Sequence, residues 1–120
     1  MNFPIPISTD ELLQTAESEN LYQKLIEQIN KDFNLANEPI DFPKSTSAHE
    51  LKVQIHEKIY RLIQYKFAEY LNLLYIIDVP EDQIKKLDGS DLLELSEQVA
   101  FLVLKREWMK VWFRNRNSFS

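Results

Sequence analysis

The chain has 120 residues, of which 44% are apolar and 28% charged, a composition typical of one folded globular domain and unlike that of a disordered chain. The absence of cysteine excludes disulfides, cysteine-ligated metal sites and cysteine nucleophiles, and the single glycine, Gly89, excludes glycine-rich phosphate loops and dinucleotide fingerprints. The net charge is −5, although bases outnumber acids after residue 104.

The N-terminal residues lack the charged and apolar regions of a signal peptide, and the longest apolar run, residues 99–104, is far too short to span a membrane. We therefore expect one cytoplasmic domain over residues 1–120. Residues 1–7 should be extended, because Pro4 and Pro6 restrict the backbone.

The first helical region is predicted to begin at Ser8 or Thr9, where Ser8 and Glu11 have the spacing of a capping box. Apolar residues at helical spacing continue this region to Phe33. Residues 18–20 favour helix caps over helix interiors, so a break at this point remains an alternative. A loop is expected over residues 34–46, which contain two prolines.

A second capping box, Ser47 to Glu50, is predicted to start the longest helix, about residues 47–77. Its central stripe, with spacings of three and four residues, consists of His56, Ile59, Ile63, Phe67, Tyr70, Leu74 and Ile77. A short helix should follow Pro80, with Gly89 in a left-handed conformation at its end. A final helix should then extend from about residue 91 to Arg114, before a basic tail at residues 114–120. The predicted fold is all-α, a small antiparallel helical bundle of three long helices and one short helix.

The final predicted helix is apolar on two sides. One stripe consists of Leu95, Val99, Leu102, Met109 and Phe113. The second stripe, roughly opposite at 100° per residue, consists of Phe101, Leu104, Trp108, Val111 and Trp112. Because a helix in a thin bundle normally buries one stripe, we expect the second stripe to be exposed and to bind a partner protein, most simply a second copy in a homodimer.

Basic residues border this predicted interface: Lys105, Arg106, Lys110, Arg114 and Arg116. They raise an alternative function, weak nucleic-acid binding through the C-terminal end. The segment from Lys110 to Arg116 is similar to the end of a homeodomain recognition helix, which carries Trp-Phe-x-Asn-Arg. The resemblance covers only these residues, because the turn which that family needs about nine residues before Trp112 falls within the predicted helix. We therefore expect no homeodomain.

No residue pattern supports catalysis, a cofactor or a metal site. The two histidines, His49 and His56, are seven residues apart, and their Cα atoms would be about 10.5 Å apart on a helix. We expect His56 to be a hydrogen-bonded member of the central stripe. A small-ligand pocket between helices, lined by His56 and tyrosines, remains a third reading. The leading hypothesis is a non-enzymatic interaction or oligomerisation module.

Overall fold

The computed structural model describes residues 2–117, and in this range the chain forms six α-helices and no strand. The helices, in chain order, are α1 (Thr9–Ser18), α2 (Tyr22–Leu35), α3 (Ala48–Tyr65), α4 (Phe67–Ile77), α5 (Glu81–Lys85) and α6 (Leu92–Asn117). The all-α prediction is confirmed. The prediction of three long helices and one short helix is wrong, because two of the predicted long helices are each divided.

Short polar side chains begin three of the helices. The Ser8 hydroxyl accepts the backbone N–H of Glu11 at 3.1 Å, and the Ser47 hydroxyl accepts that of Glu50 at 3.1 Å. The Asp91 carboxylate accepts backbone N–H groups in the first turn of α6. These bonds satisfy N–H groups that have no partner within the helix, so the predicted helix starts are confirmed.

The breaks that divide the long helices have different origins. Asn20 adopts a left-handed conformation with φ 58° between α1 and α2, at the interruption that the polar residues 18–20 suggest. Lys66 separates α3 from α4 with φ −141° and ψ 64°, although neither glycine nor proline is nearby. A continuous helix over residues 47–77 would be about 46 Å long, whereas the whole molecule extends 42 Å along its longest axis. The break at Lys66 folds α4 back, so that its apolar side packs on the core.

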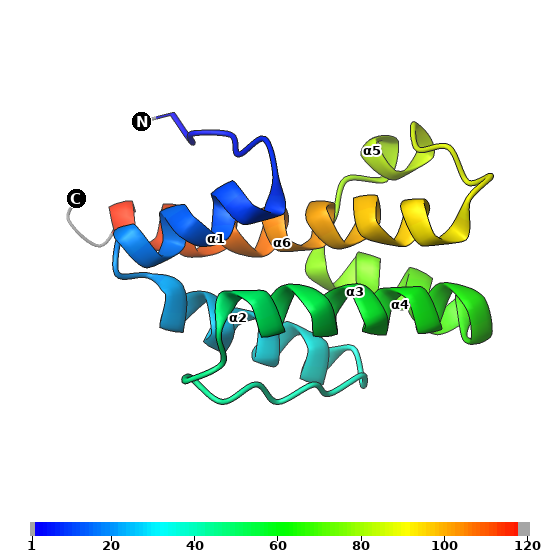
Figure 1. The fold of residues 1–120 in the computed structure, drawn as a ribbon, viewed down its shortest axis with the longest axis horizontal. Helices are drawn as coiled ribbons and strands as arrows, with labels where there is room; N and C mark the ends of the chain where they lie inside the picture. The colour runs from blue at the N-terminus through cyan, green and yellow to red at the C-terminus, as the bar shows by residue number, and fades with distance from the viewer. Residues whose placement is uncertain (1, 118–120) are drawn as a thin grey trace.

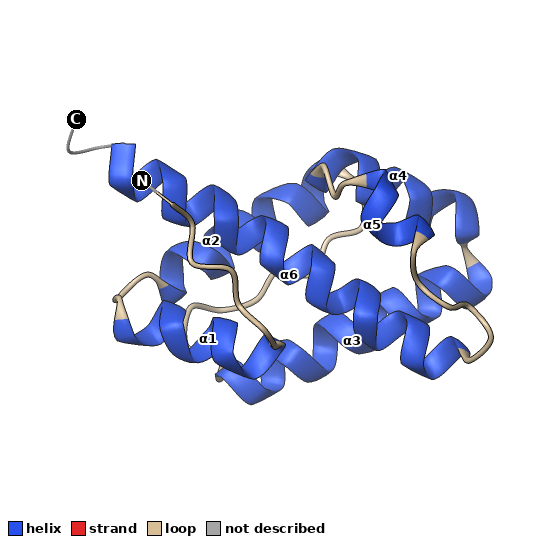
Figure 2. Cartoon of the chain, turned by 90° about the horizontal axis from the view of Figure 1, so that it is seen from above, coloured by secondary structure: helices blue, strands red, loops and turns tan. Residues whose placement is uncertain are grey.

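Helix α6 forms the axis of the fold. It contacts α1, α2, α3 and α4, and it spans most of the length of the molecule (Figure 1). Seen from above, α4 and α5 lie on one side of α6, and α1 and α3 lie on the other (Figure 2). The molecule therefore has one surrounded helix and several peripheral ones.

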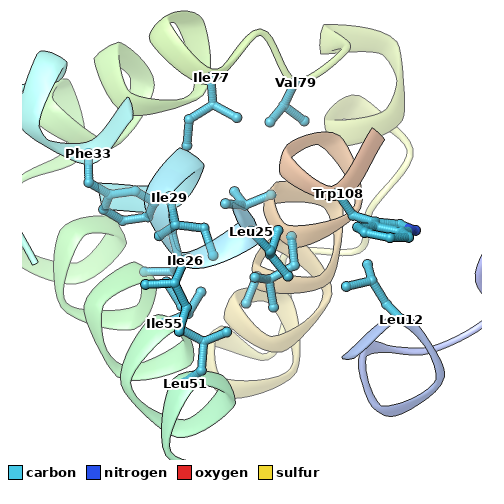
Figure 3. Packing of buried hydrophobic residues seen from close by; sticks show 14 of the residues in the cluster. Leu12, Leu25, Ile26, Ile29, Phe33, Leu51, Ile55, Ile77, Val79 and Trp108 are labelled. Carbon is cyan, nitrogen blue, oxygen red and sulfur yellow. The ribbon is translucent and has the colours of Figure 1, made fainter. Parts of the chain in front are cut away.

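The core joins α1, α2, α3, α4 and α6 (Figure 3). Trp108 of α6 lies against Leu12 of α1 and is almost fully buried. The N-terminal segment also contributes, because the Phe3 ring packs edge-on against Trp112 with their centroids 5.7 Å apart. The side chain of Asn30 fixes the loop between α2 and α3 through two hydrogen bonds to the backbone of Phe42, of 2.8 and 2.9 Å.

Two predicted boundaries near the C-terminus need correction. Helix α6 continues to Asn117, so residues 114–117 of the predicted tail are helical, and residues 118–120 lie outside the described residues. Gly89 has no positive φ; the left-handed residue that ends a helix in this region is Asp78, with φ 70°, after α4. Among residues 2–117, no helix combines the length and the apolar character that crossing a bilayer requires.

Candidate interaction surface

The face of α6 that the sequence predicts to be an exposed interface is mostly core. Trp108 and Trp112 are only 1% and 3% exposed, and Leu104 and Val111 are equally inaccessible. Phe101 alone of the five predicted interface residues is partly exposed. The prediction that this stripe is free to meet a partner is therefore wrong.

The physical reason is the number of helices around α6. The break near Asn20 allows α1 to turn away from α2 and to lie along one side of α6, while α2, α3 and α4 cover other sides. Phe3 and the guanidinium of Arg116, 4.6 Å from the ring centroid, complete the cover of Trp112. Four shorter helices thus shelter an apolar circumference of α6 that two long helices would leave open.

Three of the five predicted rim cations form ion pairs within the chain. Arg106 donates to the Asp78 carboxylate at 3.0 Å, Arg116 pairs with Glu19, and Lys110 pairs with buried acids. The other two, Lys105 and Arg114, form no ion pair within residues 2–117; Lys105 is half-buried and Arg114 is exposed. The structure therefore does not gather the five cations into one free basic surface.

Lys110 belongs to a buried polar cluster between α2 and α6. Its ammonium is 2.6 Å from Asp32 Oδ2 and 3.4 Å from Glu107 Oε1, and the Gln28 amide donates to Asp32 at 3.1 Å. Burial, together with the neighbouring Asp32, raises the pKa of Glu107 well above its ordinary value. Burial also acts to raise the pKa of Asp32, but the neighbouring Glu107 and the hydrogen bonds from Lys110 and Gln28 outweigh it and lower that pKa. These opposite shifts favour the neutral form of Glu107 and the ionised form of Asp32.

The cluster is a structural feature and not an open site. The Glu107 side chain is inaccessible to solvent, its oxygens form no hydrogen bond with a described residue, and its charged neighbour on α6 is the Lys110 ammonium at 3.4 Å. Paired carboxyl groups perform acid–base chemistry only when a substrate can reach them. The ion pair of Lys110 with Asp32 instead links α6 to α2.

The largest uncovered apolar stripe on a single helix lies on α4. Phe67, Leu71 and Tyr75 are 56%, 49% and 80% exposed. Their spacing of four residues places them on one side of the helix, next to the side formed by the buried Tyr70, Leu73, Leu74 and Ile77. We call these three residues the α4 stripe. Helix α4 thus has two apolar stripes, of which only one is covered. This is the arrangement that the sequence predicts for the final helix, α6.

Charged groups lie beyond the two ends of the α4 stripe. Lys66 is exposed at the N-terminal end and forms no ion pair in the described part of the chain. At the C-terminal end are the exposed carboxylates of Asp78 and Glu81, the former bound to Arg106 and the latter to Lys85. The helix dipole has the same polarity, positive at the first turn and negative at the last.

The α4 stripe is absent from the sequence-based predictions, because residues 47–77 are predicted to form one helix. In that helix, Phe67 belongs to the central stripe, with Ile63 and Tyr70. Two signals were available: α4 carries a single charged residue, Glu69, and Leu71 lies outside the predicted central stripe. The break at Lys66 changes the helix direction and turns Phe67 outward.

Comparison of the chain with protein-family models, with curated proteins and with solved structures finds no match.

Proposed function

We propose that this protein is a self-associating helical module, in which two copies pack through their α4 stripes about a two-fold axis. The observation that supports this proposal is the symmetry of the stripe. An aromatic ring, a leucine and a second aromatic ring follow one another at intervals of four residues, at Phe67, Leu71 and Tyr75. Apolar residues in such an uncovered row on a soluble protein are typical of an interaction surface.

A two-fold interface brings each residue opposite a residue of the same patch. With α4 antiparallel to its counterpart and Leu71 on the axis, Phe67 of one copy faces Tyr75 of the other. Aromatic rings favour such offset or edge-on pairs. The stripe is self-complementary in this arrangement, which favours a second copy over an unrelated partner.

Charge favours the same orientation. In the antiparallel pair, Lys66, which forms no ion pair in the described part of the chain, approaches the last turn of the other α4, where the carbonyl groups carry the negative end of the helix dipole. Nucleic-acid binding has less support, because the cations that suggested it are partly neutralised by acids of the same chain.

Sedimentation equilibrium of the full chain tests the proposal. We expect the native protein at about 100 µM to have twice the 14.3 kDa mass of one chain. Leu71→Lys should give a single-chain mass, because two lysines would meet on the axis.

The matched control is Leu93→Lys, which makes the same change at a leucine of α6 that is 60% exposed and lies outside the stripe. This variant should keep the mass of the native protein, and both variants should keep the helical circular dichroism spectrum. A native protein that sediments as a single chain, or a Leu71→Lys variant that still pairs, would overturn the proposal.

A further inference from the structure

A cleft lies away from the α4 stripe, over the middle of α6. It has a volume of about 770 Å³, within the usual range for small-molecule sites. The start of α1, the outer side of α3 and Leu87, which follows α5, form its walls. In Figure 1, α5 and the N-terminal segment lie on the same side of α6.

The cleft has an apolar floor. Phe101 and Leu104 of α6 line it, together with Ala100, and Val53 and Leu87 add apolar surface at its sides. Phe101 is the one residue of the predicted α6 interface that remains partly exposed, so the cleft is the accessible remainder of that face. A ligand with an apolar or aromatic body fits this floor.

The hydrogen bonds of His56 define one polar group of the cleft. Its Nε2 lies 2.8 Å from the Ser96 hydroxyl, which donates its own hydrogen to the backbone carbonyl of Leu93 at 2.8 Å. Because a hydroxyl has one hydrogen, both bonds form together in the tautomer of His56 that carries its proton on Nε2. In the neutral ring, Nδ1 is then a lone-pair acceptor, and no described residue donates to it.

Two more acceptors belong to the same lining. Glu97 is exposed and forms no ion pair with any described residue. The side-chain oxygen of Gln98 is buried and accepts no hydrogen bond within residues 2–117, so it adds negative potential behind the wall. Lys52, the only ammonium in the lining, is neutralised by Asp10 at 2.9 Å. Among the charged side chains of the lining, Lys52 and Asp10 therefore neutralise each other, and the one charge without an ion-pair partner, that of Glu97, is negative.

We infer that this cleft binds a small protonated amine with an apolar body. The ammonium would lie at Glu97 and Nδ1 of His56, which supply the acceptors that its N–H groups need. The apolar body would cover Phe101, whose ring also attracts a neighbouring cation. Anionic ligands are disfavoured, because the only cation of the lining is already paired.

Titration of the full chain with 2-phenylethylamine at pH 7, followed by backbone amide NMR shifts, tests the inference. Its matched competitors are 2-phenylethanol, which is neutral, and 3-phenylpropionate, which is anionic. We expect shifts that cluster on the residues lining the cleft, with the amine binding about tenfold more tightly than the alcohol, and the carboxylate most weakly.

Glu97→Gln should weaken binding of the amine about tenfold. Glu94→Gln, at an exposed acid of the same helix that does not line the cleft, should leave binding unchanged and controls for the change in net charge. Equal effects of the two variants, a preference for the carboxylate, or no saturable shift with any of the three probes would overturn the inference. Sedimentation of Glu97→Gln should match that of the native protein, so this test is independent of the α4 stripe.

Discussion

Helices α6 and α4 are both apolar on two sides, yet their environments differ. The tryptophans of α6 are enclosed by helices and by the N-terminal segment, whereas the outer side of α4 faces solvent. The position of a helix in the bundle, central or peripheral, therefore decides whether a two-sided apolar pattern marks core or interface. Four mutational experiments test this comparison.

The largest effect is expected in the centre of the covered helix. Trp108→Ala should lower the free energy of unfolding by about 4 kcal/mol, because the ring is buried against α1 and leaves a cavity. Urea denaturation at a fixed protein concentration measures this loss. A change below about 1 kcal/mol would contradict the view that this side of α6 is core.

A second large effect is expected at the polar contact between α2 and α6. Lys110→Met keeps most of the apolar stem but removes the cation beside Asp32 and Glu107. The Asp32 carboxylate would then be buried without its cation, which should lower the free energy of unfolding by about 3 kcal/mol at pH 7, as measured by urea denaturation. The loss should shrink toward acid pH, where Asp32 becomes protonated; a loss that does not change with pH would contradict this role of Lys110.

The same cluster predicts a pH dependence. Because the folded state raises the pKa of Glu107, the unfolded chain releases this proton first as the pH rises above 4.5, the ordinary value, and the native protein is destabilised over that range. Glu107→Gln has no proton to lose, so its stability relative to the native protein should rise by up to about 1.4 kcal/mol per pH unit. Thermal unfolding between pH 5 and 8 should show this divergence, and parallel curves would show that Glu107 is ionised in the folded protein.

The smallest stability effect is expected on α4. Tyr75→Ala removes a ring that is 80% exposed, so the free energy of unfolding of dilute protein should change by less than about 0.5 kcal/mol. A loss comparable to that of Trp108→Ala would show that the α4 stripe is part of the core of a single chain.

Local signals in the sequence predicted much of the secondary structure. Ser8 and Ser47 cap helices as expected, and the loop predicted over residues 34–46 lies between α2 and α3. His56 makes the predicted hydrogen bond, although its partner, Ser96, is forty residues away and was not foreseen. Such pairs depend on which helices become neighbours.

The wrong prediction of an exposed interface on α6 also arises because contacts between distant helices cannot be predicted from local patterns. Nothing near Lys66 signals a break, since its neighbours favour helix as much as the residues before them. The break is stabilised by the burial of Tyr70 and Ile77 after the chain has folded back. Because the break was not predicted, the outward face of α4 and the cover on α6 were both assigned wrongly.

The sequence by itself determined that the chain is all-helical, where most helices begin and which residues are apolar enough to be buried, because capping and periodicity act within a few residues. Only the tertiary structure decided which apolar face is covered, how Asp32 meets Glu107 and where a cleft remains over α6. Those outcomes depend on contacts between distant segments, in which the gain from burying apolar surface outweighs the local preference of Lys66 to continue a helix.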